Sequence, residues 1–296
     1  MALESRGYGV LGPSKSGKTM MVGALQIAAR NVAQEGDLSH DIVTPNKEMM
    51  QLLRTYGVGL TRQEGLPPVD GTLDVCRYSF SLRTTRRRLF GRTDASETRF
   101  ELLDGPGASL LPQVGRASLD ADVEDAHRER LLSELSRARG FILCVDPTNP
   151  EDLPTFFVEL PALLEEVIQR RQSPLERVVV CLTKADKHFQ AHGPRALSQA
   201  RSSDPVSVLR SLMAPAGLRS LELLCRKPTL LGVCWTSVFG FAEGAPNFNP
   251  QTGGLRHTAP SCGFPKAAAL WQPFQVLDPF VFAATGKAEG VFCMPA

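Results

Sequence analysis

The chain has 296 residues, of which 43% are hydrophobic and 22% charged, and its formal net charge is +2. Its length and apolar content allow a large buried core. The near-neutral charge excludes a protein that attracts nucleic acid or anionic membrane over its whole surface, so we expect no nucleic-acid partner.

No segment approaches the roughly 20 consecutive apolar residues that a transmembrane helix requires. The first ten residues, MALESRGYGV, lack the basic segment and apolar run of an export signal. The cysteines form no CxxC pair, and Cys144, Cys181 and Cys234 each fall in an apolar run that predicts a buried strand. These features predict a cytoplasmic protein whose cysteines are reduced core residues.

The first predicted elements are a short strand at 7–11, the loop GPSKSGKT at 12–19 and a helix over about 17–34. A glycine-rich loop between a strand and a helix is typical of a phosphate site, because the helix N-terminus presents free N–H groups and a positive dipole end. Lys18 can reach the β and γ phosphates, and the Thr19 hydroxyl can bind Mg²⁺. The alternative is a polar turn that only caps the helix. The predicted phosphate-binding residues are Gly12, Pro13, Ser14, Lys15, Ser16, Gly17, Lys18 and Thr19.

Residues 35–71 form a predicted insertion with a helix at 46–56 and a loop after it. Strands at 73–83 and 96–103 follow, and the segment between them is too short for a crossover helix, so we expect an antiparallel hairpin. The arginines at 86–88 lie at its tip, where a solvated basic turn is the simplest interpretation.

The sequence DGPG at 104–107 follows the second hairpin strand directly. A carboxylate at the end of a strand beside the phosphate loop is well placed to hold the same Mg²⁺, so Asp104 is a predicted metal ligand. Gly107 can offer a backbone N–H to a γ-phosphate. On its own, DGPG is more typical of a structural turn, but its position after an apolar strand favours the metal site.

Three further apolar runs, GFILCVD, VVVCLTK and LLGVCWTS, alternate with helical patterns. Such runs are typical of a parallel sheet covered on both faces. We therefore predict a three-layer α/β fold with a mostly parallel six-stranded sheet and one antiparallel edge strand, which together with the phosphate loop resembles the P-loop NTPase fold. We expect a single domain over 1–296, with insertions at about 35–71 and 240–273, and polar loop structure over 187–204.

The ends of the last two of these runs carry motifs that suit a purine base. In TKAD at 183–186, the Asp186 carboxylate can accept two parallel hydrogen bonds from guanine, and the stem of Lys184 can cover the ring. In TSVFG at 236–240, Ser237 can brace that loop and the Val238 N–H can donate to guanine O6. The predicted base-site residues are Thr183, Lys184, Asp186, Ser237 and Val238.

The order GPSKSGKT, DGPG, TKAD and TSV resembles that of P-loop GTPases of the translation-factor and Ras-like (TRAFAC) class, over about residues 5–240. A looser resemblance, in GLPPVDGT and ALWQPFQVLDPFVF, is to bacterial double-GTPase-type proteins. The family resemblance implies GTP and GDP binding with Mg²⁺ and a conformational switch. It also implies a switch threonine that binds Mg²⁺ and acts in catalysis; Thr72 is the first candidate and Thr61 the second.

Two departures from the family concern catalysis. Ala108 and Ser109 follow the DGPG motif where Ras-like enzymes carry a water-positioning glutamine, which implies slow hydrolysis unless a partner supplies the missing group. Lys15, inside the phosphate loop, can place positive charge near the bridging oxygens, the role that the resemblance gives to an arginine finger or monovalent cation in other members, or it can point into solvent. We expect loops 58–72 and 104–122 to present a surface to an effector or activating protein, and a dimer or heteromer remains open on the sequence.

Two alternatives to a GTPase switch remain open on the sequence. One is a catalytically weak pseudo-GTPase that serves as a nucleotide-dependent scaffold, which the absent glutamine favours. The other is an ATP-dependent phosphotransferase, which would need an acceptor site that no motif indicates.

Overall fold

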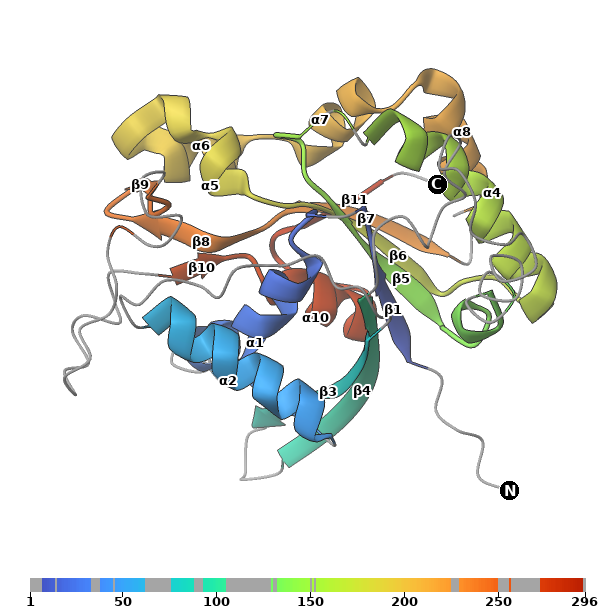
Figure 1. Ribbon diagram of the computed structural model, residues 1–296, viewed down its shortest axis with the longest axis horizontal. Helices are drawn as coiled ribbons and strands as arrows, with labels where there is room; N and C mark the ends of the chain where they lie inside the picture. The colour runs from blue at the N-terminus through green and yellow to red at the C-terminus, as the bar shows by residue number, and fades with distance from the viewer. Residues whose placement is uncertain are drawn as a thin grey trace, which may run out of the picture.

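The long apolar runs of the sequence form the middle of a β-sheet with helices on both faces (Figure 1). This confirms the three-layer α/β prediction. The structure, a computed structural model, describes residues 7–13, 15–32, 38–44, 46–61, 76–87, 93–104, 129, 132–149, 151, 153–224, 229–249, 256 and 272–294.

Within the described residues, the large sheet has eight strands in the order β11-β7-β6-β5-β1-β4-β3-β2. Neighbours from β7 to β4 pair in parallel, whereas β3 is antiparallel to β4, β2 to β3 and β11 to β7. The prediction of six strands was therefore low by two, and the hairpin strand β3 is not at the edge. The strands are β1 (Tyr8–Leu11), β2 (Leu38–Val43), β3 (Cys76–Arg87), β4 (Thr93–Asp104), β5 (Gly140–Val145), β6 (Arg177–Leu182), β7 (Leu230–Trp235) and β11 (Val291–Cys293).

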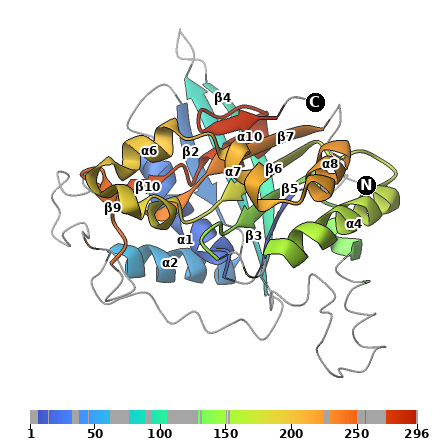
Figure 2. The same ribbon diagram turned by 90° about the horizontal axis from the view of Figure 1, so that it is seen from above.

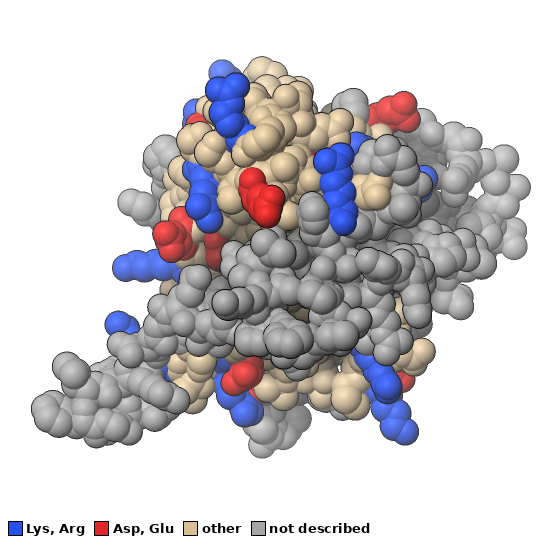
Figure 3. Space-filling view, turned by 90° about the vertical axis from the view of Figure 1, so that its left-hand side faces the viewer, with Lys and Arg blue, Asp and Glu red and all other residues tan. Residues whose placement is uncertain are grey.

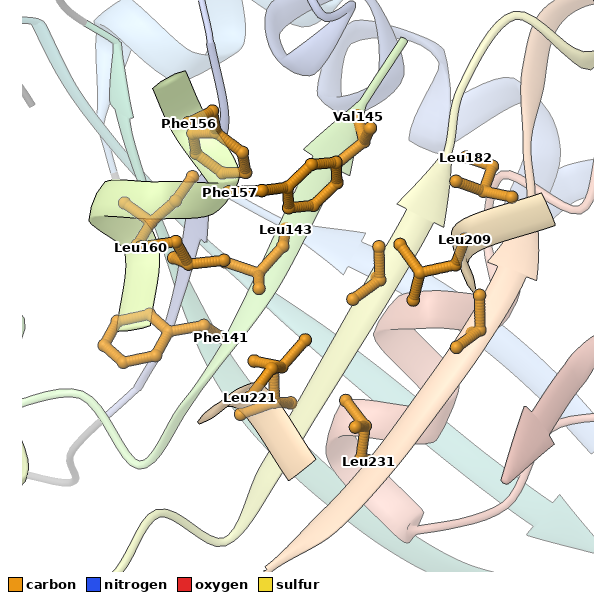
Figure 4. Packing of buried hydrophobic residues seen from close by; sticks show 14 of the residues in the cluster. Phe141, Leu143, Val145, Phe156, Phe157, Leu160, Leu182, Leu209, Leu221 and Leu231 are labelled. Atoms are coloured by element: carbon orange, nitrogen blue, oxygen red, sulfur yellow. The ribbon is translucent and has the colours of Figure 1, made fainter. Parts of the chain in front are cut away.

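The central strands are buried on both faces, so alternate residues enter two separate cores. On β5, Phe141, Leu143 and Val145 point to one core and face the helix that carries Phe156 and Leu160 (Figure 4). The opposite core takes the other residues of the central strands. There Cys144, Cys181 and Cys234 lie in register on three adjacent strands as buried free thiols, as the sequence predicted.

The helices divide between these two faces, as both views show (Figures 1 and 2). Three of them pack on the face that includes Cys144, namely α1 (Lys18–Val32), α2 (Lys47–Thr61) and α10 (Asp278–Thr285). The opposite face is covered by α4 (Leu153–Arg171), α5 (Ala185–His188), α6 (Ala196–Ser202), α7 (Pro205–Leu212) and α8 (Pro215–Leu224). The expected loop over 187–204 is thus replaced by the end of α5, the 3₁₀ helix η2 (Gln190–Arg195) and α6.

The predicted antiparallel hairpin is confirmed as β3 and β4, with longer strands than expected. Pairing runs from Cys76 opposite Asp104 to Arg87 opposite Thr93. Strand β2 lies in the region predicted as an insertion and extends this hairpin. The predicted helix of that region is α2, which runs to Thr61.

A second, three-stranded sheet, β10-β8-β9, follows the end of β7. Its strands are β8 (Ser237–Ala242), β9 (Ala245–Pro246) and β10 (Gln272–Phe274). The predicted irregular insertion at 240–273 therefore begins and ends in this sheet. Only Thr236 separates β7 from β8, so the small sheet stands directly at the end of the large one.

Charged side chains are dispersed over the left-hand side of the molecule as drawn in Figure 1. Lys and Arg side chains alternate there with Asp and Glu on the described surface (Figure 3). None of the described helices combines the length and the apolar character needed to cross a bilayer.

Candidate functional site

The phosphate-loop sequence lies between β1 and α1, as predicted, and two glycines fix its path. Gly12 follows β1 with φ +152°, and a Cβ there would collide with the carbonyl oxygen of Cys144 on the neighbouring strand. Gly17 has φ +89° and precedes the first residue of α1. The loop is therefore held against the sheet, with the helix N-terminus directed at the space above it.

Lys18 and Ser16 place polar groups inside this loop. The Lys18 side chain is buried, and its Nζ donates to the carbonyl oxygens of Gly12 at 2.9 Å and Pro13 at 2.8 Å. The Ser16 hydroxyl is buried and has no hydrogen-bond partner among the described residues. A buried orphan hydroxyl and a glycine cradle fit an anion with several acceptor oxygens, such as a phosphate.

The two base motifs meet at the ends of β6 and β7, which are parallel neighbours with Leu182 opposite Trp235. The N–H of Ala185 donates to the carbonyl of Thr236 at 3.1 Å, and the N–H of Thr236 donates to that of Leu182 at 2.9 Å. The sheet register thus brings TKAD and TSV side by side.

Asp186 of the base motif is buried, with 2% of its surface exposed. Ser237 Oγ donates to its Oδ1, and the Gly240 N–H donates to Ser237 Oγ at 2.8 Å. Burial raises the pKa of Asp186 to about 6, although the hydrogen bond from Ser237 and the charge of Lys184 act in the opposite direction. The carboxylate is consequently fixed in orientation and ionised at neutral pH.

Thr183 joins the base motif to the phosphate loop. Its hydroxyl lies 2.7 Å from the carbonyl oxygen of Ser16 and 3.0 Å from that of Val145. Its backbone N–H also donates to Val145 at 2.7 Å. Gly17 and Thr183 are 166 positions apart in the sequence. The two loops are nevertheless in direct contact at the edge of the sheet.

Lys184 makes a second connection between the same loops. Its backbone is left-handed, with φ 57°, as is that of Lys15, with φ 59°. Lys184 Nζ donates to the carbonyl oxygen of Lys15 at 2.9 Å and to Asp146 Oδ2 at 2.5 Å. The side chain of Lys15 itself is exposed.

A cavity of about 280 Å³ lies between the phosphate loop and the base motifs. Its lining is mainly apolar, with polar groups from Thr183, Lys184 and Asp186. Such a cavity suits a flat aromatic ligand whose edge meets the acid. The lining residues are Gly17, Met20, Met21, Thr183, Lys184, Asp186, Lys187, Thr236, Val238, Phe239 and Phe248.

The predicted Mg²⁺ ligands are placed only in part. Thr19 lies in the first turn of α1. Asp104 is the last residue of β4, level with Gly12 because Leu102 pairs with Val10, but its side chain lies outside the described part. Ser14, Thr72 and Gly107 also lie outside the described residues. The part of the chain that the structure describes holds no group of three His, Cys, Asp or Glu side chains that suits a metal ion.

The sequence prediction missed three kinds of residue at this site. Asp146 follows the buried strand β5, a position that the reasoning applied to Asp104 would also have indicated. Met20 and Met21 occupy the first turn of α1, where they are indistinguishable from core residues by pattern. Phe239 and Phe248 come from the small sheet and its loop, and their ring centroids are 5.3 Å apart.

No protein-family model matches the chain, and no curated protein matches it. A signal recognition particle receptor SRb-GTP/SRX complex from Chaetomium thermophilum is 14% identical with a TM-score of 0.39, and the match covers 82% of this chain and 95% of that one. The complex of SsGBP with GDP is 17% identical with a TM-score of 0.33, covering 80% of this chain and 46% of that one.

A third similar structure is the ADP ribosylation factor-like GTP binding protein, or small COPII coat GTPase SAR1, from Encephalitozoon cuniculi in complex with GDP. It is 12% identical with a TM-score of 0.25, and the match covers 86% of this chain and 67% of that one. At such low TM-scores these matches do not identify a ligand for this chain.

Proposed function

We propose that this chain binds GTP and GDP with Mg²⁺ and acts as a guanine-nucleotide-dependent switch that hydrolyses GTP slowly. The observation that carries this proposal is the cavity that Gly17 of the phosphate loop and Asp186 of the base motif line together. A mononucleotide has a phosphate chain at one end, which suits the phosphate loop, and a base at the other, which suits the base motif.

At the phosphate end, a bound nucleotide would take the place of the loop carbonyls that Lys18 now contacts. The N–H groups at the start of α1 and the Ser16 hydroxyl would supply further donors. We assign Thr19, Asp104 and the switch residue Thr72 to Mg²⁺, and the Gly107 N–H to the γ-phosphate.

At the base end, the Asp186 carboxylate would accept from the N1 and N2 donors of guanine, and the Val238 N–H would donate to O6. Adenine offers no such donor pair, which is why the proposal is a guanine nucleotide. The fixed position of the carboxylate, held by Ser237, supports this assignment because an aligned acceptor loses little freedom on binding.

For hydrolysis, we propose in-line attack by water, with developing charge stabilised by Lys18, Mg²⁺ and Lys15. The chain carries Ala108 where Ras-like enzymes have glutamine, so the rate without a partner should be low. Loops 58–72 and 104–122 would change with the γ-phosphate and contact a protein partner or a second GTPase in the cytoplasm. We place the chain among P-loop GTPases of the TRAFAC class, and its narrower likeness to the bacterial double-GTPase type stays a prediction.

The second candidate is a pseudo-GTPase that holds nucleotide as part of a scaffold. The absent glutamine favours it, and single-turnover kinetics separate the two. A slow but measurable release of phosphate from bound GTP that Lys18→Ala abolishes supports the enzyme. Tight GTP binding with no phosphate release, alone or with a captured partner, supports the scaffold.

The test of the base assignment is nucleotide preference. Wild-type protein should bind GDP at least about 100-fold more tightly than ADP. Adenine lacks the donor pair of guanine and would leave the buried Asp186 carboxylate without hydrogen bonds from the base. Asp186→Asn should lose that preference and gain affinity for xanthosine diphosphate, which offers an acceptor where guanine has a donor. Equal binding of ADP and GDP by the wild type would contradict the proposal.

A further inference from the structure

Asp146 is a buried carboxylate directly after β5, the strand between β1 and β6. Its side chain is only 5% exposed. A buried carboxylate is unfavourable unless its oxygens are paired. Both oxygens are paired here: Oδ1 accepts from the N–H of Thr148 at 2.9 Å and from its hydroxyl at 2.7 Å, and Oδ2 accepts from Lys184 Nζ at 2.5 Å.

The two contacts of Thr148 fix the direction of the carboxylate. Because Thr148 binds one oxygen from both its backbone and its side chain, the other oxygen is aimed at Lys184. Charge-assisted hydrogen bonds of this kind are short and about twice as strong as neutral ones. Asp146 therefore holds the Lys184 ammonium in one place.

That ammonium is also bonded to the phosphate loop through the Lys15 carbonyl. One group thus connects the end of β5, the phosphate loop and the base motif. Lys184 and Lys15 both have left-handed backbone conformations, which are unfavourable for residues other than glycine and persist only where contacts enforce them. The connection is made entirely by groups of the chain itself.

Lys184 lines the cavity, and its ammonium is held by the Lys15 carbonyl and by Asp146. A lysine side chain loses considerable rotamer entropy when it is immobilised, and here contacts within the chain itself hold the ammonium. A flat base in the cavity would then pack against a lysine side chain whose position the chain itself holds.

We propose that Asp146 is a positioning residue of the nucleotide site, which holds Lys184 against the phosphate loop and thereby slows nucleotide release. The inference rests on the proposed guanine-nucleotide binding and adds a residue to it. Asp146 acts on the face of the base and on the phosphate loop, whereas Asp186 acts on the edge of the base. The two carboxylates therefore have separable effects.

The first test compares dissociation of GDP and inosine diphosphate from the wild type and Asp146→Asn. The asparagine keeps the shape and an acceptor for Thr148 but removes the charge that holds Lys184. We expect dissociation on the order of ten-fold faster for both nucleotides, with their ranking unchanged. Asp204→Asn is the matched control, because Asp204 also accepts from a backbone N–H and a hydroxyl two to three residues on, at the start of α7 away from the cavity.

A double-mutant cycle separates positioning from a general loss of structure. Lys184→Met should accelerate release, and adding Asp146→Asn to it should have no further effect, because the residue through which Asp146 acts is gone. Additive effects would overturn the proposal, as would wild-type release rates in Asp146→Asn. If the wild type binds no guanine nucleotide, the proposed function itself is wrong. That outcome is distinct from a failure of the Asp146 proposal, in which the wild type binds nucleotide but the variants do not behave as expected.

If Asp146→Asn does not fold, the proposal can be tested on the wild-type protein without nucleotide. Lys187 is exposed, whereas the Lys184 side chain is 35% exposed and its ammonium is bonded to Lys15 and Asp146. Brief acetylation followed by mass spectrometry should modify Lys184 several-fold more slowly than Lys187. Equal modification would show that the ammonium is not held, and would overturn the proposal.

Discussion

The Asp186 carboxyl shows how one residue can make ligand binding depend on pH. It is buried, and burial raises its pKa to about 6. The hydrogen bond from Ser237, the N–H groups of Asp186 and Lys187, and the charge of Lys184 all favour the ionised form but do not cancel the effect of burial. Only the ionised form can accept two hydrogen bonds from a guanine edge.

GDP affinity should therefore fall as the solution becomes more acidic than pH 6. Below the pKa the nucleotide must displace a proton from Asp186, so affinity should drop about ten-fold for each further pH unit and be constant above about pH 7. A terminal phosphate titrates near the same pH. Asp186→Asn is the control, because its residual binding should keep only the phosphate contribution; identical profiles for the two proteins would contradict the prediction.

At the scale of single residues, spacing within a short motif was sufficient to nominate Lys18, Asp186 and Ser237. Lys18 and Asp186 stand where a strand leads through a loop into a helix, and Ser237 begins β8 just after the end of β7. The position of Asp146 after a buried strand could have been noted, but its role depends on Lys184, which follows the next strand of the sheet and lies 38 positions later. Phe248 was missed for a similar reason, because it reaches the cavity from a loop whose path no local pattern specifies.

Among the elements, the buried strands were predictable and the edges of the sheet were not. Runs such as GFILCV are apolar throughout because both of their faces are covered. Strand β2 contains His40 and Asp41 and is formed by pairing with β3, and β11 has only three residues. Helix α6 buries only Ala196 and Ala200, so its sequence carries little apolar periodicity.

The small sheet and the loop after it contribute two aromatic side chains to the cavity, and we expect these side chains to take part in ligand binding. Phe239 of β8 and Phe248 both line the cavity, and their rings are in contact. Stacking of a base on an aromatic ring contributes about 1–3 kcal/mol. A purine in this cavity should therefore gain affinity from Phe248 whatever its hydrogen-bonding edge.

Phe248→Leu should weaken GDP and inosine diphosphate binding equally, by roughly five- to ten-fold, because leucine keeps apolar area but offers no ring to stack on. Isothermal calorimetry measures both affinities. The matched control is Phe274→Leu, which removes a ring packed on Phe241 in the same small sheet but outside the cavity. If Phe274→Leu weakens binding as much, the effect comes from the integrity of the sheet and not from contact with the base.

At the scale of the whole molecule, the cavity joins segments that are far apart along the chain. Its walls come from the β1–α1 loop, the β6–α5 loop and the small sheet after β7. A ligand that needs all three segments binds only the folded state. Nucleotide binding should therefore stabilise the fold through mass action as well as through local contacts.

Differential scanning calorimetry of thermal unfolding tests whether nucleotide binding stabilises the fold. The same experiment tests the prediction of a single domain over 1–296. GDP at 100 times its Kd should add about 2.7 kcal/mol to the free energy of unfolding. If the chain is one cooperative unit, the whole transition should move to higher temperature without changing its shape, because the two cores share the same strands. Asp186→Asn should show a much smaller shift with GDP at that concentration, because only residual binding remains, and a larger shift with xanthosine diphosphate. A second transition that GDP leaves in place would mean that part of the chain unfolds independently, and the single-domain prediction would be wrong even though the nucleotide site is intact.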